Sequence, residues 1–334
     1  MKRTILIIHP GALGDALLAV PSIRSLSARF PQHETVLIAS AAVSRLLSEC
    51  GLIDDWIPLE GQACLGLFSG TSSISGELQS RLNRCDLAVV WTEDKDNALR
   101  SRFQDLGVPR VRIQSPFSQE LRTRHQSNRF LETLGETAGD IFPERTVQVP
   151  SHLLEWGKAY LETLNTSPDR PLVLVHPGSG SAHKCLEPRR MVLLIEQLWR
   201  GGGCPLVLEG PADKDIVSHT LQFMSKPPLV LRDLDLSQLT GVLAQIAVYI
   251  GHDSGVTHLS ALLGVQTIAL FGPTDPQRWA PHGSHVTILC GAPCFCESWE
   301  TVKKCEGKPC LQVPITEILM ASGLAIEEEQ CKPS

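Results

Sequence analysis

The sequence predicts an α/β protein made of two doubly wound domains. Short apolar runs are repeatedly followed by a glycine-rich turn and an amphipathic stretch, which is the pattern of βα units on a parallel sheet. The chain has 334 residues, of which 43% are hydrophobic and 20% are charged. This is enough for two domains that each bury a core.

The expected strands fall into two groups along the chain. In the first half they are TILII (4–8), ETVLIAS (34–40), DLAVVW (86–91) and RVRI (110–113). In the second half they are PLVLVHPG (171–178), PLVLEGP (205–211), PLVLRD (228–233), AVYIGHD (247–253) and QTIALFG (266–272). A polar stretch with one expected helix and prolines near both ends, residues 144–171, separates the groups. We therefore predict domains at 1–168 and 169–334.

Composition excludes several classes of function. The formal net charge is −6 and long basic runs are absent, which argues against binding to nucleic acid. No uncharged apolar span reaches about 20 residues, so we expect a soluble protein. Eleven cysteines in a chain of this length, without a secretory signal, indicate reduced thiols in the cytoplasm.

Ligands of open α/β sheets bind at the carboxyl ends of the strands, and the first loop of interest there is HPGALGD, residues 9–15. Gly11 and Gly14 permit a tight turn with the backbone close to a ligand. Asp15 fits either an N-cap of the next helix or a carboxylate base that the helix dipole keeps ionised. Pro21 predicts that the helix is kinked or restarts there.

The second loop is HPGSGSAHK, residues 176–184. Its small residues can direct N–H and hydroxyl groups at one anion, and Lys184 adds a positive charge. These small residues are Gly178, Ser179, Gly180 and Ser181. The spacing matches neither Walker A nor G-x-G-x-x-G. A phosphate-binding loop and an ordinary turn with a solvated lysine both fit it.

The third loop is HDSGVTH, residues 252–258. Asp253, Ser254 and Gly255 form the turn, and His258 lies one helical turn further on. Taken separately, Asp253 fits an N-cap and His258 a partly buried, hydrogen-bonded side chain.

Together the three loops resemble glycosyltransferase family 9, the heptosyltransferases. The matching segments are 5–31, 176–191 and 249–283 (YIGHDSGVTHLSALLGVQTIALFGPTDPQRWAPHG), in that order. The resemblance implies the GT-B architecture, in which two Rossmann-like domains face each other across a cleft. It assigns the acceptor to the N-terminal domain and the nucleotide-sugar to the C-terminal one. It further implies transfer of heptose from ADP-heptose to the lipopolysaccharide inner core, with inversion and with no essential metal or other cofactor.

Such a transfer must stabilise charge on the departing diphosphate and remove a proton from the attacking hydroxyl. By resemblance, Asp15 is the base and Lys184 binds phosphate. The implied donor-binding residues are Ser179, Gly180, Lys184, Asp253, Ser254, Gly255 and His258. An acidic residue after the strand LVLEGP would hold the ribose hydroxyls. Glu209 and Asp213 are candidates, and we favour Asp213.

The chain departs from the family pattern at two places. The family usually has arginine or lysine where His9 stands, so the charge offered to the acceptor would depend on pH. It commonly has tryptophan after the lysine, where this chain has Cys185 and Leu186. Both changes fall near the expected pocket, so a different donor sugar or acceptor on the same architecture is the alternative.

An acceptor that carries carboxylates and phosphates needs a cationic surface. Residues 100–129 contain seven arginines and only two acidic residues. We expect Arg122 and Arg124, together with His9 and Gly14, to contribute to the acceptor site or to a rim in peripheral contact with the inner face of the inner membrane. A solvated face with ordinary ion pairs is the alternative.

Five cysteines cluster near the C-terminus, at positions 290, 294, 296, 305 and 310. Their spacing lacks the paired C-x-x-C knuckles of zinc sites, so we predict reduced thiols or a local disulfide and no metal. From other classes, a non-catalytic nucleotide-sugar-binding protein and a nicotinamide-dependent oxidoreductase remain alternatives. Asp15 favours catalysis, because binding alone needs no base, and the first loop lacks the nicotinamide fingerprint.

Overall fold

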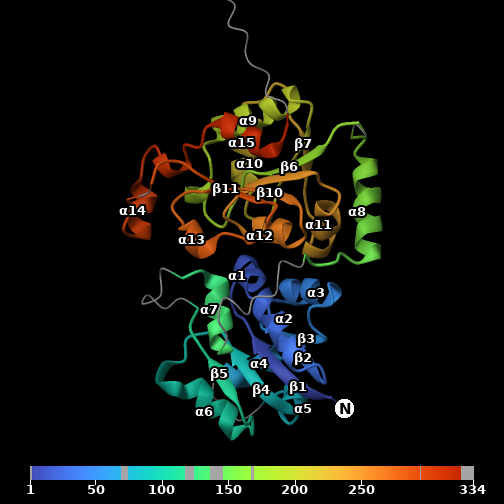
Figure 1. Ribbon diagram of the computed structural model, residues 1–334, viewed down its shortest axis with the longest axis vertical. Helices are drawn as coiled ribbons and strands as arrows, with labels where there is room; N and C mark the ends of the chain where they lie inside the picture. The colour runs from blue at the N-terminus through green and yellow to red at the C-terminus, as the bar shows by residue number, and fades with distance from the viewer. Residues whose placement is uncertain are drawn as a thin grey trace, which may run out of the picture. The chain divides into compact units, whose positions relative to one another are not determined.

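The computed structural model describes residues 2–68, 74–116, 124–135, 146–166, 169–293 and 295–324. The chain divides into two compact units, residues 1–145 and 146–334. Each unit contains one sheet whose strand pairs are all parallel, with helices packed against it (Figure 1). The predicted α/β class with two parallel sheets is confirmed.

The sheet of the first unit has the order β3-β2-β1-β4-β5. Its strands are β1 (Arg3–Ile8), β2 (His33–Ala39), β3 (Asp55–Pro58), β4 (Cys85–Val90) and β5 (Val111–Ile113). Its helices are α1 (Leu13–Leu18), α2 (Val20–Arg29), α3 (Ala41–Glu49), α4 (Gln62–Phe68), α5 (Gly76–Leu82), the 3-10 turn η1 (Lys95–Asn97), α6 (Ala98–Asp105) and α7 (Gln126–Thr133).

Helices pack against this sheet, and the side chains on both faces of β1 are buried. Leu6 and Ile8 of β1 share a core with α4, α5 and α6, while α2 and α7 pack against each other elsewhere in the unit. Because both of its faces are buried, β1 is apolar without alternation over Ile5–Ile8. Helix α1 ends before α2 begins, with Pro21 in the first turn of α2, so the predicted restart at this proline is confirmed.

The sheet of the second unit has the order β11-β10-β9-β6-β7-β8. Its strands are β6 (Leu172–His176), β7 (Cys204–Leu208), β8 (Leu229–Leu231), β9 (Val248–His252), β10 (Gln266–Phe271) and β11 (Val286–Cys290). Its helices and 3-10 turns are α8 (Ser151–Thr163), η4 (Ala182–Lys184), α9 (Pro188–Arg200), α10 (Lys214–Leu221), α11 (Leu236–Leu243), α12 (Gly255–Leu262), α13 (Pro276–Trp279), α14 (Trp299–Lys304), η5 (Pro309–Leu311) and α15 (Ile315–Ser322).

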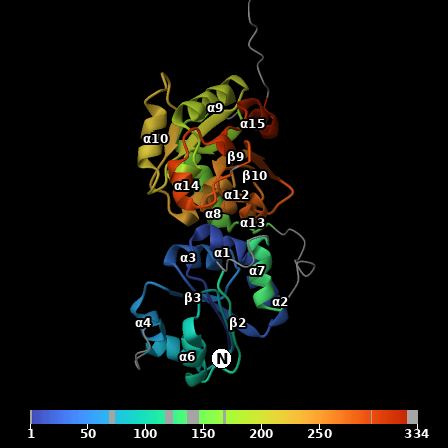
Figure 2. The same cartoon turned by 90° about the vertical axis from the view of Figure 1, so that its left-hand side faces the viewer.

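One core of this unit joins α9, α10 and α15 to the sheet, and Figure 2 shows α9 and α15 side by side. Helix α12 packs on β9 and β10, and α8 packs along α11. In the sheet, β6 and β9 are neighbours, with His176 opposite Gly251. Their carboxyl ends therefore bring the second and third loops together.

Helix α8 corrects the predicted domain boundary. The sequence places the boundary at 168, which assigns this helix to the first domain, but the units divide at residue 145. The reason is a close helix contact: a Cβ on Gly157 of α8 would lie 2.1 Å from the carbonyl oxygen of Gly241 in α11. The absence of both side chains lets the two backbones touch, so α8 is part of the second unit.

Candidate functional site

The second and third loops meet at a charged pair. Lys184 Nζ lies 2.7 Å from Asp253 Oδ2, and Ser179 Oγ donates a hydrogen bond of 2.6 Å to the carbonyl oxygen of Asp253. Asp253 follows β9, and Lys184 ends the turn η4 after β6. The lysine keeps ammonium hydrogens for an anion, because its three donors exceed the one bond to Asp253.

The first turn of α12 faces the same loops. Ser254 is its N-cap, and the Ser254 side chain accepts the N–H of Thr257. The preceding N–H groups, those of Gly255 and Val256, have no partner within a helix. They add the positive end of the helix dipole beside Lys184. This combination of a lysine, a serine and a helix N-terminus is suited to a diphosphate.

A buried polar network that we did not expect lies beneath these loops. His176 Nδ1 lies 3.2 Å from the Tyr249 hydroxyl, which in turn lies 3.1 Å from Thr257 Oγ1. Thr257 also donates to the carbonyl of His252. The sequence does carry a signal for this network, since β6 ends at His176 and β9 ends at His252, each just before a glycine-containing loop.

Asp213 is part of this network. Its Oδ2 lies 2.9 Å from His176 Nε2 and accepts the Gly210 N–H at 3.0 Å, and the residue is 6% exposed. Burial raises the pKa of this carboxyl, but the hydrogen bond and charge of His176 outweigh it, so the net pKa is lowered. The Gly178 backbone also lies against the carboxylate. Asp213 thus contacts the second loop at His176 and Gly178 and holds it in place.

Glu209, the other candidate for the ribose, lies directly after β7. Its Oε1 is 3.0 Å from Arg232 Nε. The carboxylate is held by one exposed arginine rather than by the interior network, so it retains acceptor capacity for hydroxyl groups.

His258 and His252 are held neutral by their surroundings. Burial lowers the pKa of His258 to about 4, although the nearby Asp253 raises it. Burial also lowers the pKa of His252 to about 4, and its Nε2 accepts the Leu186 N–H at 2.9 Å. Leu186 and Cys185 are themselves buried. These departures from the family pattern therefore belong to the packing behind the loop.

In the first unit, Asp15 lies within the first turn of α1, whose N-cap is Ala12. Asp15 is therefore not the N-cap, which removes one of its two interpretations. Its side chain packs over Gly11, where an added Cβ would lie 2.9 Å from Asp15 Cβ and 3.1 Å from Oδ2. Gly14 is the residue before it in the same turn.

His9 is buried behind this loop. Its Nδ1 accepts the Gly11 N–H at 3.2 Å, and its ring contacts the edges of Trp91 and Phe130. Burial lowers its pKa to about 4, so the ring is neutral at pH 7. The expectation that His9 offers a pH-dependent charge to an acceptor is therefore wrong for the neutral range, and the structure gives it a role in supporting Gly11.

The arginines of residues 100–129 have different surroundings. Arg100 and Arg102 donate to main-chain carbonyls, Arg129 is buried, and Arg124 pairs with Glu132. Arg122 lies outside the described residues.

The structure describes four of the five C-terminal cysteines. Within the described ranges, no group of three or more His, Cys, Asp or Glu side chains is arranged to hold a metal ion. Cys290 and Cys305 have free thiols, whereas Cys294 lies outside those ranges. Within the same ranges, no helix combines the length and the apolarity needed to cross a membrane.

Comparison with known proteins adds the family context. Residues 118–308 match the profile of glycosyltransferase family 9 (heptosyltransferase). Lipopolysaccharide heptosyltransferase 2 of Escherichia coli strain K12 is 24% identical over 309 residues, which cover 85% of this chain and 87% of that protein.

Two of the similar solved structures illustrate the shared fold. A glycosyltransferase family 9 protein from Veillonella parvula DSM 2008 superposes with a TM-score of 0.80 at 18% identity, covering 96% of both chains. E. coli ADP-heptose lipopolysaccharide heptosyltransferase II gives a TM-score of 0.72 at 20% identity, covering 96% of this chain and 98% of that one. The predicted GT-B fold is thereby confirmed.

Proposed function

Because this chain belongs to glycosyltransferase family 9, the heptosyltransferases, we propose that it moves heptose from ADP-heptose to the lipopolysaccharide inner core, with inversion. The observation that carries the proposal is the cradle formed by Lys184, Ser179 and the first turn of α12. It concentrates positive charge and N–H donors where two loops of one sheet meet.

In this proposal the cradle binds the diphosphate of the donor. Lys184 donates its remaining ammonium hydrogens to the phosphate oxygens, and the Gly255 and Val256 N–H groups donate to the same oxygens. Negative charge grows on the diphosphate as the sugar leaves, so fixed donors stabilise the transition state more than the bound substrate. Ser179, Gly180 and Ser254 shape the cradle, and His258 packs behind Asp253.

For the ribose hydroxyls we now favour Glu209 over Asp213. The Asp213 carboxylate is bound by His176 and Gly210, and releasing it would leave the buried Nε2 of His176 without this partner. Glu209 can accept hydroxyl hydrogens while it keeps its contact with Arg232.

The base in this proposal is Asp15 of the first unit. Its carboxylate takes the proton of the acceptor hydroxyl as the hydroxyl oxygen bonds to the anomeric carbon. The bond from that carbon to the diphosphate oxygen breaks, and ADP leaves with the electron pair. A single displacement of this kind inverts the anomeric carbon. The helix dipole of α1 keeps the carboxylate ionised before attack.

The acceptor would lie on the first unit beside Gly14 and Asp15, with Arg122 and Arg124 as candidate partners for its phosphates and carboxylates. We propose action in the cytoplasm, with peripheral contact at the inner face of the inner membrane, where such an acceptor is anchored.

Thermal-shift titrations test the donor assignment. Ligands that bind only the folded chain raise its Tm, so we expect ADP-heptose to raise it more than UDP-glucose or GDP-mannose at equal concentration. The Lys184→Ala variant should lose most of that shift. A larger shift with UDP-glucose or GDP-mannose would support a transferase for another sugar, and equal shifts would remove the adenine preference.

A further inference from the structure

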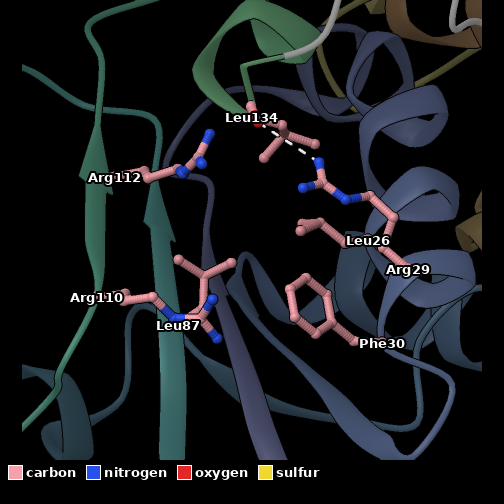
Figure 3. A pocket seen from close by; sticks show the side chains of 7 residues that line it. All are labelled: Leu26, Arg29, Phe30, Leu87, Arg110, Arg112 and Leu134. Carbon is pink, nitrogen blue, oxygen red and sulfur yellow. Dashed lines mark hydrogen bonds between the residues drawn. The ribbon is translucent and has the colours of Figure 1, made fainter.

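Three arginines of the first unit converge on one small cavity (Figure 3). Arg29 reaches it from α2 and Arg112 from β5, while Arg110 lies directly before β5. The remaining walls are apolar: Leu26, Phe30, Leu87 and Leu134. We propose that this cavity is an anion site that binds a phosphate group, separate from the donor cradle and from the Asp15 loop.

Main-chain contacts hold the arginines in place. Arg112 Nη1 donates to the Thr133 carbonyl at 3.1 Å, and Arg110 Nε donates to the Asp86 carbonyl at 3.1 Å. Among the described residues, the hydrogen-bond partners of Arg110 and Arg112 are carbonyls and not carboxylates. Each of these bonds uses one of the five N–H donors of a guanidinium, so donors remain for a ligand.

Two further contacts orient the other groups. Arg29 Nη1 lies 3.5 Å from the Leu134 carbonyl oxygen, and the Arg110 guanidinium lies 5.6 Å from the centre of the Phe30 ring. Thr133 and Leu134 are at the C-terminal end of α7. Arg29 and Arg112 therefore share that helix end, which explains why they lie close together despite their like charge.

The charge and the size of the cavity indicate its ligand. Arg110 and Arg112 each bring a positive charge to the cavity and have main-chain carbonyls as their printed partners among the described residues, so an anion bound there would be attracted to both. The cavity volume is about 40 Å³, above the ~10–15 Å³ that one water needs. That space suits a phosphate head and is too small for a nucleotide-sugar. A guanidinium group can donate two parallel hydrogen bonds to two oxygens of one phosphate group.

The cavity is remote from the proposed catalytic loop. Asp15 follows the carboxyl end of β1, whereas the cavity lies at the end of α2, a helix that starts near that loop at Val20 and ends at Arg29. Leu87 is near the amino end of β4. The inference therefore does not rest on the proposed function.

Isothermal titration calorimetry of the full chain with inorganic phosphate tests the site. A second titration, with glucose 6-phosphate, distinguishes a site for free phosphate from a site for a phosphate ester of a sugar. Both titrations are repeated on a double variant that carries Arg110→Gln and Arg112→Gln. We expect it to weaken phosphate binding at the cavity at least about tenfold. Arg84→Gln is the matched control, because Arg84 also donates to main-chain carbonyls. Tighter binding of glucose 6-phosphate would identify an ester as the ligand, and tighter binding of inorganic phosphate would identify the free ion.

Equal phosphate affinity in the double variant and the wild type would overturn the proposal. If the double variant does not fold, Arg112→Lys keeps the charge but loses the fork, and it should still weaken binding. Crystals of the wild type soaked in tungstate, a phosphate mimic, give a test that needs no variant. An anomalous peak between Arg29, Arg110 and Arg112 is expected, and its absence at a saturating concentration would overturn the site.

Discussion

At the scale of single residues, Lys184 shows how one charge can serve both structure and ligand. Its bond to Asp253 joins two loops of the second unit, and its remaining donors are available to a diphosphate. We expect Lys184→Ala to lower kcat/KM for ADP-heptose by about 100-fold, because one preorganised donor to a developing oxyanion contributes that much.

Steady-state ADP release measures this loss. Lys214→Ala is the control, since Lys214 is an exposed lysine of the same unit, and its activity should match the wild type. Wild-type kcat/KM in Lys184→Ala would exclude the lysine from the donor cradle.

Buried neutral histidines make stability depend on pH. The folded pKa of His252 is about 4, below the ~6.5 of an unfolded histidine. The unfolded chain thus binds more protons, so the free energy of unfolding falls as the pH drops from about 6.5 towards 4. For His252 the loss at pH 5 is on the order of 2 kcal/mol.

Urea unfolding at pH 7 and pH 5 checks this. The His252→Gln variant retains an acceptor for the Leu186 N–H but has no titrating ring, so it should lose less stability between the two pH values than the wild type. Identical losses in both proteins would show that His252 titrates normally.

The residue scale also shows what could be predicted from sequence. The pattern singled out Asp15, Lys184 and Asp253 as candidates by residue type and by position after a strand, because those features are local. It did not reveal that Asp213 is bound by His176, or that His9 is buried between Trp91 and Phe130. Those contacts join residues far apart in sequence, so no local pattern contains them.

At the scale of elements, the contact between α8 and α11 is a specific feature of the second unit. Gly157→Ala would put a Cβ 2.1 Å from a backbone oxygen, which no rotamer change can relieve. We expect it to destabilise the second unit by on the order of 2 kcal/mol. Thermal unfolding followed by circular dichroism measures the effect.

Gly76→Ala is the control for this substitution. It also lies in a helix, α5, but an added Cβ there would meet nothing within 4 Å, so the Tm should stay the same or rise slightly. A wild-type Tm for Gly157→Ala would mean that α8 and α11 can move apart without loss of stability, which would contradict the prediction.

All nine predicted strands are present, and the two that sequence missed, β3 and β11, are edge strands. Central parallel strands are buried on both faces and show long apolar runs. Strand β3 has only four residues and one fully buried side chain, and β11 is only partly buried. Their hydrophobic signal is correspondingly weak.

The difference in the domain boundary has a similar origin. The prolines around α8 mark loops, but they do not show on which unit the helix packs.

At the scale of the whole molecule, each unit supplies a different part of the proposed chemistry. The second unit contributes the donor cradle, and the first contributes Asp15. Neither unit alone holds both a phosphate cradle for the donor and a base for the acceptor. The proposal therefore requires that a substitution in the first unit can stop turnover without weakening the binding of the donor to the second unit.

The Asp15→Asn variant tests this claim most directly. It keeps the size of the side chain over Gly11 but removes the base, while Asp105→Asn, at an exposed position of the same unit, serves as the control. Turnover of ADP-heptose with a lipopolysaccharide-core acceptor and the Kd for ADP-heptose should be measured on both variants. The account predicts that kcat falls by about 10²–10⁴-fold in Asp15→Asn, with Kd unchanged and with Asp105→Asn fully active. Wild-type kcat in Asp15→Asn would contradict it.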